Sequence, residues 1–122
     1  RLAVRDRLFV MVRGSVADLF DATAELCRGK RQDWMGDVEA LIEVAEDMVR
    51  DAAVHGAGAA QPLLNADVHE EIIRWSAALW PAGIARCHEA LQDIREDLLA
   101  NVAGRTAVDS LVTAIRAELH SR

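Results

Sequence analysis

Apolar residues recur every three or four positions along most of the chain, which is the spacing of an amphipathic α-helix. Runs of β-branched residues that would indicate strands are absent from the sequence. The pattern therefore predicts a single domain over residues 1–122, an all-α compact bundle of about six amphipathic helices. The expected helices cover approximately residues 2–13, 16–28, 33–55, 67–79, 81–102 and 105–119.

Polar residues and glycines mark several of the expected helix ends. Ser15 can accept a hydrogen bond from a free backbone N–H, and Asp18 follows three residues later, which predicts a capping box. Asp67 and Glu70 have the same spacing before the fourth helix. Gly29 is placed for a left-handed turn after the second helix, because glycine adopts that conformation without steric cost.

Glycine and proline separate the remaining helices. Residues 56–65 form a short linker that we expect to be mobile from its composition, and Pro62 makes a helix interior there unfavourable. Pro81 fits the first turn of the fifth helix, where its missing N–H costs nothing. Gly104 is expected to end the fifth helix and separate it from the sixth.

The spacing of apolar residues also predicts which side chains form the core. Trp75 lies on the apolar stripe of the fourth helix and is expected to be buried, whereas Trp80 stands at a helix junction and fits either packing or an interface. In the second helix we expect Val16, Leu19 and Phe20 to be buried together. Continuous stripes follow the third, fifth and sixth helices, at 38, 41, 42, 45, 48, 49 and 52, at 84, 87, 91, 94 and 98, and at 108, 111, 112, 115 and 119.

The composition is that of a folded, acidic protein. It is 52% hydrophobic, which argues against disorder, and 20 acidic residues against 14 Lys and Arg give a net charge of −6. Without a basic stripe, we expect no direct nucleic-acid binding by this chain. The acidic residues of the third helix are expected to form a solvated surface; they are Glu43, Glu46, Asp47 and Asp51.

The cysteines and the ends of the chain suggest an intracellular fragment. Cys27 and Cys87 are sixty residues apart beside apolar positions, which favours two buried free thiols over a disulfide. No signal peptide or apolar run of membrane-spanning length is visible, so we expect a cytoplasmic location and no membrane partner. The chain begins with Arg1 in a helical pattern, and we expect it to be the C-terminal part of a longer protein.

Motifs that carry chemistry are missing from the sequence. There is no GxxxxGK[ST] phosphate loop, so we expect neither nucleotide hydrolysis nor a bound cofactor. The four histidines lie on different expected helices, and none belongs to an HExxH motif, so a metal site is not expected. A carboxylate pair on the third helix could in principle act in acid–base chemistry, but no set of pocket-forming residues accompanies it.

The stretch from Asp93 to Leu119, DIREDLLANVAGRTAVDSLVTAIRAEL, closely resembles the C-terminal end of bacterial DNA polymerase III clamp-loader subunits, above all delta prime. There a helix closes on an Asn-Val-Asn-Pro-Arg-like segment before a final helix. Asn101 and Arg105 fall on the family's Asn and Arg, while Ala103 and Gly104 replace Asn-Pro. Further similar segments follow in the family's order: LFDATAELCRGKRQDW, EDMVRDAAV and PLLNADVHEEI.

The resemblance implies a non-catalytic collar domain that packs with other clamp-loader subunits and holds an ATP-driven, sliding-clamp loading complex together in DNA replication. The expected interface or hinge residues are Arg95, Leu99, Asn101, Arg105 and Ala114. Leu99 and Ala114, like Ile73, lie off the main apolar stripes, which indicates a second contact face in addition to the core. The alternatives are the tau/gamma collar, a helical interaction module of another assembly, and a small helical enzyme or ligand-binding bundle.

Overall fold

Residues 2–121 fold into six α-helices and one short 3-10 helix. A computed structural model describes residues 2–121, and no strand occurs among them, which confirms the all-α prediction. The elements are α1 (Leu2–Arg13), α2 (Val16–Leu26), α3 (Arg31–Gly56), η1 (Ala66–Val68), α4 (His69–Leu79), α5 (Ala82–Leu99) and α6 (Gly104–Leu119). None of these helices is long and apolar enough to cross a lipid bilayer.

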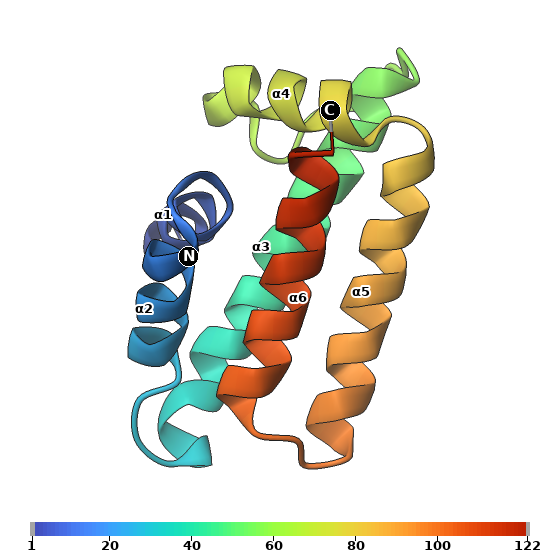
Figure 1. Cartoon of the computed structure of the whole chain (residues 1–122). Helices are drawn as coiled ribbons and strands as arrows, with labels where there is room; N and C mark the ends of the chain where they lie inside the picture. The colour runs from blue at the N-terminus through green and yellow to red at the C-terminus, as the bar shows by residue number, and fades with distance from the viewer. Residues whose placement is uncertain (1, 122) are drawn as a thin grey trace.

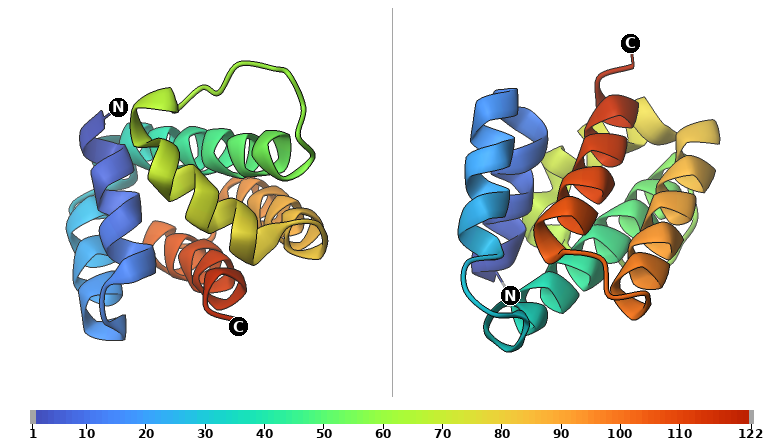
Figure 2. Two further views of the ribbon diagram at one scale, coloured as in Figure 1. Left: turned by 90° about the horizontal axis from the view of Figure 1, so that it is seen from above. Right: turned by 60° about the horizontal axis from the view of Figure 1, so that its bottom comes forward.

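The longest helix, α3, is central and contacts each of the other five α-helices. Figure 1 shows α3, α5 and α6 running alongside one another, with α1 and α2 as a hairpin on one side and α4 across the top. Seen from above, α4 lies between α3 and α6, with the α1–α2 hairpin and α5 at opposite ends (Figure 2). The side chains predicted for the core of α3 and most of those predicted for α6 are buried where these helices meet.

The N-terminal cap of α2 forms as predicted, but the buried face of this helix is narrower than the sequence predicted. Ser15 Oγ accepts a hydrogen bond from Asp18 N at 3.0 Å, and Ser15 N donates to the Asp18 carboxylate at 2.9 Å. The prediction that Val16 and Phe20 are buried is wrong, because they are 54% and 42% exposed. The cause is the position of α2 at the edge of the bundle, where it contacts only α1, α3 and α6. Only one narrow face, which includes Leu19, is therefore covered.

A buried carboxylate corrects the prediction of a fully solvated acidic face on α3. Asp51 is fully buried, and its oxygens accept hydrogen bonds from Leu64 N at 2.9 Å and Asn65 N at 2.7 Å. Arg50 adds an ion pair to the same carboxylate at 2.9 Å. Asp51 therefore fixes the end of the 57–65 linker against α3, although composition predicted a mobile segment.

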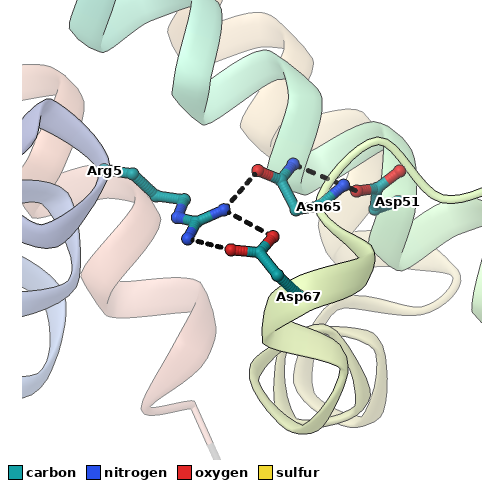
Figure 3. A network of polar contacts seen from close by, with 4 residues as sticks. All are labelled: Arg5, Asp51, Asn65 and Asp67. Atoms are coloured by element: carbon teal, nitrogen blue, oxygen red, sulfur yellow. Dashed lines mark hydrogen bonds and ion pairs between the residues drawn. The ribbon is translucent and has the colours of Figure 1, made fainter. Parts of the chain in front are cut away.

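The predicted capping box at Asp67 and Glu70 does not form. Asp67 instead makes a two-pronged ion pair with the buried Arg5 of α1, at 2.9 and 2.5 Å, and Asn65 accepts a further hydrogen bond from Arg5 at 3.2 Å (Figure 3). The Arg5 hydrogen bond lowers the pKa of the Asp67 carboxyl below its usual value. A long-range partner thus outcompetes the local cap, and η1 precedes α4 in its place.

A second buried carboxylate anchors α4 to α1. Glu71 is 6% exposed, accepts a hydrogen bond from the indole N–H of Trp75 at 3.0 Å, and is paired with Arg13 and Arg74. Trp75 is buried in the core as predicted, with its ring edge-on to Phe9. The polar atoms of Glu71 are therefore used in holding helices together.

The ends of α5 and α6 differ from the predictions in three places. Pro81 is the residue before α5 and not within its first turn, and α5 ends at Leu99 instead of near Val102. Gly104 begins α6 and is buried against the Trp34 ring, whose Cη2 atom would lie 2.5 Å from an added Cβ. Glycine is thus needed at position 104 for close packing against Trp34. The chain itself reverses direction two to three residues before Gly104.

Candidate functional site

The apolar groove between α3 and α5 is the candidate site. It encloses about 410 Å³ near the N-terminal half of α3 and the C-terminal half of α5. Two of the predicted interface residues, Arg95 and Leu99, meet in it. The other lining residues are Arg31, Met35, Glu39, Ile42, Glu43 and Leu98.

Leu99 is the most exposed large hydrophobic side chain among the described residues. It is 88% exposed at the last position of α5, while its neighbour Leu98 packs partly against the core. Met35 is half-buried on the facing wall of the groove. A single exposed leucine is ordinary on a protein surface, but one that extends an apolar groove is typical of a protein-binding surface.

Two arginines fix the walls of the groove relative to each other. Arg95 of α5 forms an ion pair with Glu46 of α3. Arg31 donates a hydrogen bond at 2.6 Å to the carbonyl of Leu98, and its guanidinium lies 5.4 Å from the ring centre of Trp34. Both cations are therefore engaged within the domain, and Arg95 contributes to the site by holding α5 against α3.

The turn after α5 orients Leu99, and Asn101 makes that turn through its backbone. Asn101 has a φ of +62°, its N–H donates to Leu98 O at 3.2 Å, and Val102 N donates to Asp97 O at 2.9 Å. These two bonds form a Schellman motif, which satisfies carbonyls at a helix C-terminus and requires a left-handed residue. Asn101 therefore caps the C-terminal end of α5 through its left-handed backbone, and its predicted role as a hinge stays a prediction.

Substitution of Asn101 tests this role. Asn101→Val should lower the free energy of unfolding by about 1–2 kcal/mol, because a β-branched residue is strained at positive φ. Asn101→Gly is the matched control and should leave stability unchanged or slightly raised, because glycine adopts the same φ freely. Urea denaturation followed by circular dichroism measures both. If the Val variant is as stable as the Gly variant, the left-handed turn does not anchor the end of α5.

The other two predicted site residues lie away from this groove. Arg105 is exposed in the first turn of α6, near Cys27 and Asp109. Ala114 is half-buried and precedes Glu118 by one helical turn, and Glu118 accepts a hydrogen bond from Arg86 of α5 at 2.6 Å. Ala114 therefore lies on the side of α6 that faces α5, and it does not share a surface with Leu99.

A second apolar depression, of about 350 Å³, lies between α2 and α6. Sequence reasoning missed it because the helical pattern assigned Val16 and Phe20 to the core. Val16 and Phe20 are four residues apart, so they lie together at the edge of the buried stripe of α2. This edge position is the only sequence signal that could have indicated their exposure. The remaining lining residues are Leu19, Thr113, Arg116, Ala117 and His120.

The thiols and histidines do not converge on a reactive centre within residues 2–121. Cys27 and Cys87 are free, and burial raises the pKa of these thiols to about 11 and about 12, so both remain protonated at neutral pH. His55 and His69 stack edge-on with ring centres 5.7 Å apart. No group of three or more His, Cys, Asp or Glu residues in this part of the chain is arranged to hold a metal ion.

Comparisons with protein families, with curated proteins and with solved structures find no match to this chain. Its function is therefore inferred from the residues and their geometry.

Proposed function

We propose that the chain is a non-catalytic oligomerisation domain, similar to the collar of a bacterial DNA polymerase III clamp loader and most like its delta prime subunit. The observation that carries this proposal is the position of Leu99, which is 88% exposed at the edge of an apolar groove between α3 and α5. An apolar side chain held in water by a capped helix end is suited to insertion into a partner.

The use of the buried polar groups supports an assembly role over a catalytic one. Arg5, Asp51 and Glu71 are the buried charged residues in the described chain, and each of them connects two or more elements. A catalytic centre requires polar groups that remain available to a substrate in a concave site. The groove between α3 and α5 instead has an apolar floor, with charged residues at its edge.

Leu99→Glu tests the proposal in a mixture with the other clamp-loader subunits encoded in the same genome. Burial of a charge at the contact should weaken assembly by at least about 30-fold, as expected for an interface hot spot worth 2 kcal/mol or more. Circular dichroism should be unchanged, because the side chain is almost fully solvated in this chain alone. Size-exclusion chromatography of the mixture and titration calorimetry measure the effect.

Leu2→Glu is the matched control, since Leu2 is 63% exposed in the first turn of α1 and outside the groove. This variant should assemble like the parent protein. Equal assembly of the Leu99 variant and this control would contradict the proposed contact. Assembly with tau/gamma-type partners in place of the delta prime arrangement would favour the paralogous collar, and capture by no clamp-loader subunit would favour a helical interaction module of another assembly.

A further inference from the structure

We infer that a small pocket between α1, α4 and α6 binds the free carboxylate of a partner protein's C-terminal residue, and that this residue has an apolar side chain. The pocket encloses about 220 Å³ where the C-terminal ends of α1 and α6 meet α4. Its charged lining residues are Arg13, Glu71 and Arg74, and its apolar lining residues are Val12, Trp75 and Leu119. The pocket shares no residue with the groove between α3 and α5, so the inference does not depend on the proposed function.

The buried carboxylate of Glu71 orients both arginines of the pocket. Its Oε1 atom accepts hydrogen bonds from the indole N–H of Trp75 at 3.0 Å and from Arg13 Nε at 3.1 Å. Its Oε2 atom is paired with Arg13 and, at 3.0 Å, with Arg74. The Arg13 guanidinium also lies 5.0 Å from the ring centre of Phe9. The two cations are thus held in place before a ligand arrives, which lowers the entropic cost of binding one.

The pocket carries a surplus positive charge. Asp67 and Glu118 each pair with one arginine, whereas Glu71 pairs with two. Among the described residues, Arg13 contacts Glu71 through Nε and Nη2, and Arg74 contacts it through Nη1 alone. Both side chains are exposed, so the N–H groups on their other nitrogens can donate to a ligand. Guanidinium groups bind carboxylates through charge-assisted hydrogen bonds, and a second carboxylate would balance the surplus charge.

Other acids near the two arginines lie outside the pocket. Asp6 and Glu70 line adjoining depressions, and both are exposed to solvent. Interactions between exposed charges are weak because water screens them. These acids therefore offset little of the positive charge inside the pocket.

The apolar lining and the size of the pocket select the kind of carboxylate. Trp75, Val12 and Leu119 lie beside the arginines, so an apolar side chain can be covered while its carboxylate meets the guanidinium groups. His120 closes the end of α6 against α1, because its Nε2 donates to the carbonyl of Val12 at 2.8 Å. Sites for drug-sized ligands enclose roughly 300–1,000 Å³, so this smaller pocket suits one residue. A C-terminal residue supplies both groups at once, and capture of a terminal carboxylate is a known mode of peptide recognition.

The test titrates the protein with N-acetylleucine, which carries the carboxylate and side chain of a terminal leucine. The indole N–H signal of Trp75 in the ¹⁵N-labelled protein reports binding, because this N–H is bonded to Glu71. The signal should shift with a dissociation constant of about 1–10 mM, as expected for so small a ligand. The neutral N-acetylleucinamide should not shift it. N-acetylglutamic acid α-amide, whose carboxylate is on the side chain, and inorganic phosphate should bind more weakly at the same ionic strength.

Arg74→Gln should weaken binding of N-acetylleucine by about tenfold, the effect of losing one charge-assisted hydrogen bond. The matched control is Arg28→Gln, because Arg28 is also exposed and pairs with a glutamate three residues earlier, at 2.6 Å. This control should bind like the parent protein, and circular dichroism should show that both variants are folded.

Equal weakening by the two arginine variants would overturn the inference, since attraction would then depend on net charge alone. Equal shifts with N-acetylleucinamide would show that the carboxylate is not recognised. Equal or tighter binding of the glutamate derivative or of phosphate would contradict a terminal apolar residue as the ligand. An unchanged Trp75 signal in the N-acetylleucine titration would also overturn the inference, and it would leave the proposed assembly through the α3–α5 groove untouched.

Discussion

Asp51→Ala should destabilise the protein by about 3 kcal/mol. Asp51 is fully buried and accepts a hydrogen bond from the backbone N–H of Leu64. It also accepts hydrogen bonds from the backbone N–H and the side chain of Asn65 (Figure 3). Removal of the carboxylate leaves these donors without a partner and frees the linker from α3. For a domain of this size the midpoint of thermal unfolding should fall by roughly 10 °C.

The control for this change is Asp37→Ala, on the same helix but exposed to solvent. It should shift the thermal midpoint by no more than about 2 °C, because substitutions at exposed sites cost within about 0.5 kcal/mol. Hydrogen exchange should also show faster exchange of the Leu64 and Asn65 amides in the Asp51 variant. If the two alanine variants have the same thermal midpoint, Asp51 does not anchor the linker.

Gly104→Ala and Gly36→Ala should change stability in opposite directions. A Cβ at Gly104 would lie 2.5 to 2.7 Å from three atoms of the Trp34 ring, which is itself buried, so the ring or α6 must move. Overpacking of this kind costs about 1–3 kcal/mol. Gly36 is inside α3 with no heavy atom within 4 Å of an added Cβ, so alanine there should raise stability by about 0.8–1 kcal/mol through helix propensity.

Differential scanning calorimetry of the two alanine variants measures this contrast directly. The combined fluorescence of the three tryptophans provides a second measurement, because displacement of the Trp34 ring should expose it to water and shift the emission maximum to longer wavelength in the Gly104 variant only. An increase in thermal midpoint for both variants would show that Gly104 does not pack closely against Trp34, and that α6 begins with glycine for another reason.

Features set by neighbours in the sequence were predictable, and features set by distant residues were not. The capping box of Ser15 and Asp18 formed as predicted because both of its hydrogen bonds join residues three positions apart. The spacing at Asp67 is equally suitable, yet its carboxylate binds Arg5, sixty-two residues earlier. The spacing of Asp51 from the other acids of α3 predicted a solvent-exposed position. Asp51 is buried because the linker folds back over it, which the local sequence does not indicate.

The candidate site was predictable in part for the same reason. Leu99 lies off the apolar stripe of α5, which predicted an exposed side chain, and Leu99 is 88% exposed in the structure. Its role as a contact residue stays a prediction. The opposite wall, with Met35 and Glu39, comes from α3, and its approach to α5 depends on packing that no local pattern encodes. Ala114 also lies off the apolar stripe of its helix, but it faces α5 and is half-buried. The reason is that α6 packs against all five other α-helices, whereas α5 packs against only α3, α4 and α6.

We propose that this chain assembles with clamp-loader subunits through the groove between α3 and α5. Native mass spectrometry of the chain mixed with those subunits tests it most directly. We expect a complex that contains this 13.4 kDa chain together with partner subunits, and we expect Leu99→Glu but not Leu2→Glu to abolish it. Detection of this chain only as a free monomer in the mixture, or of a complex that Leu99→Glu leaves intact, would contradict the proposed assembly through this groove.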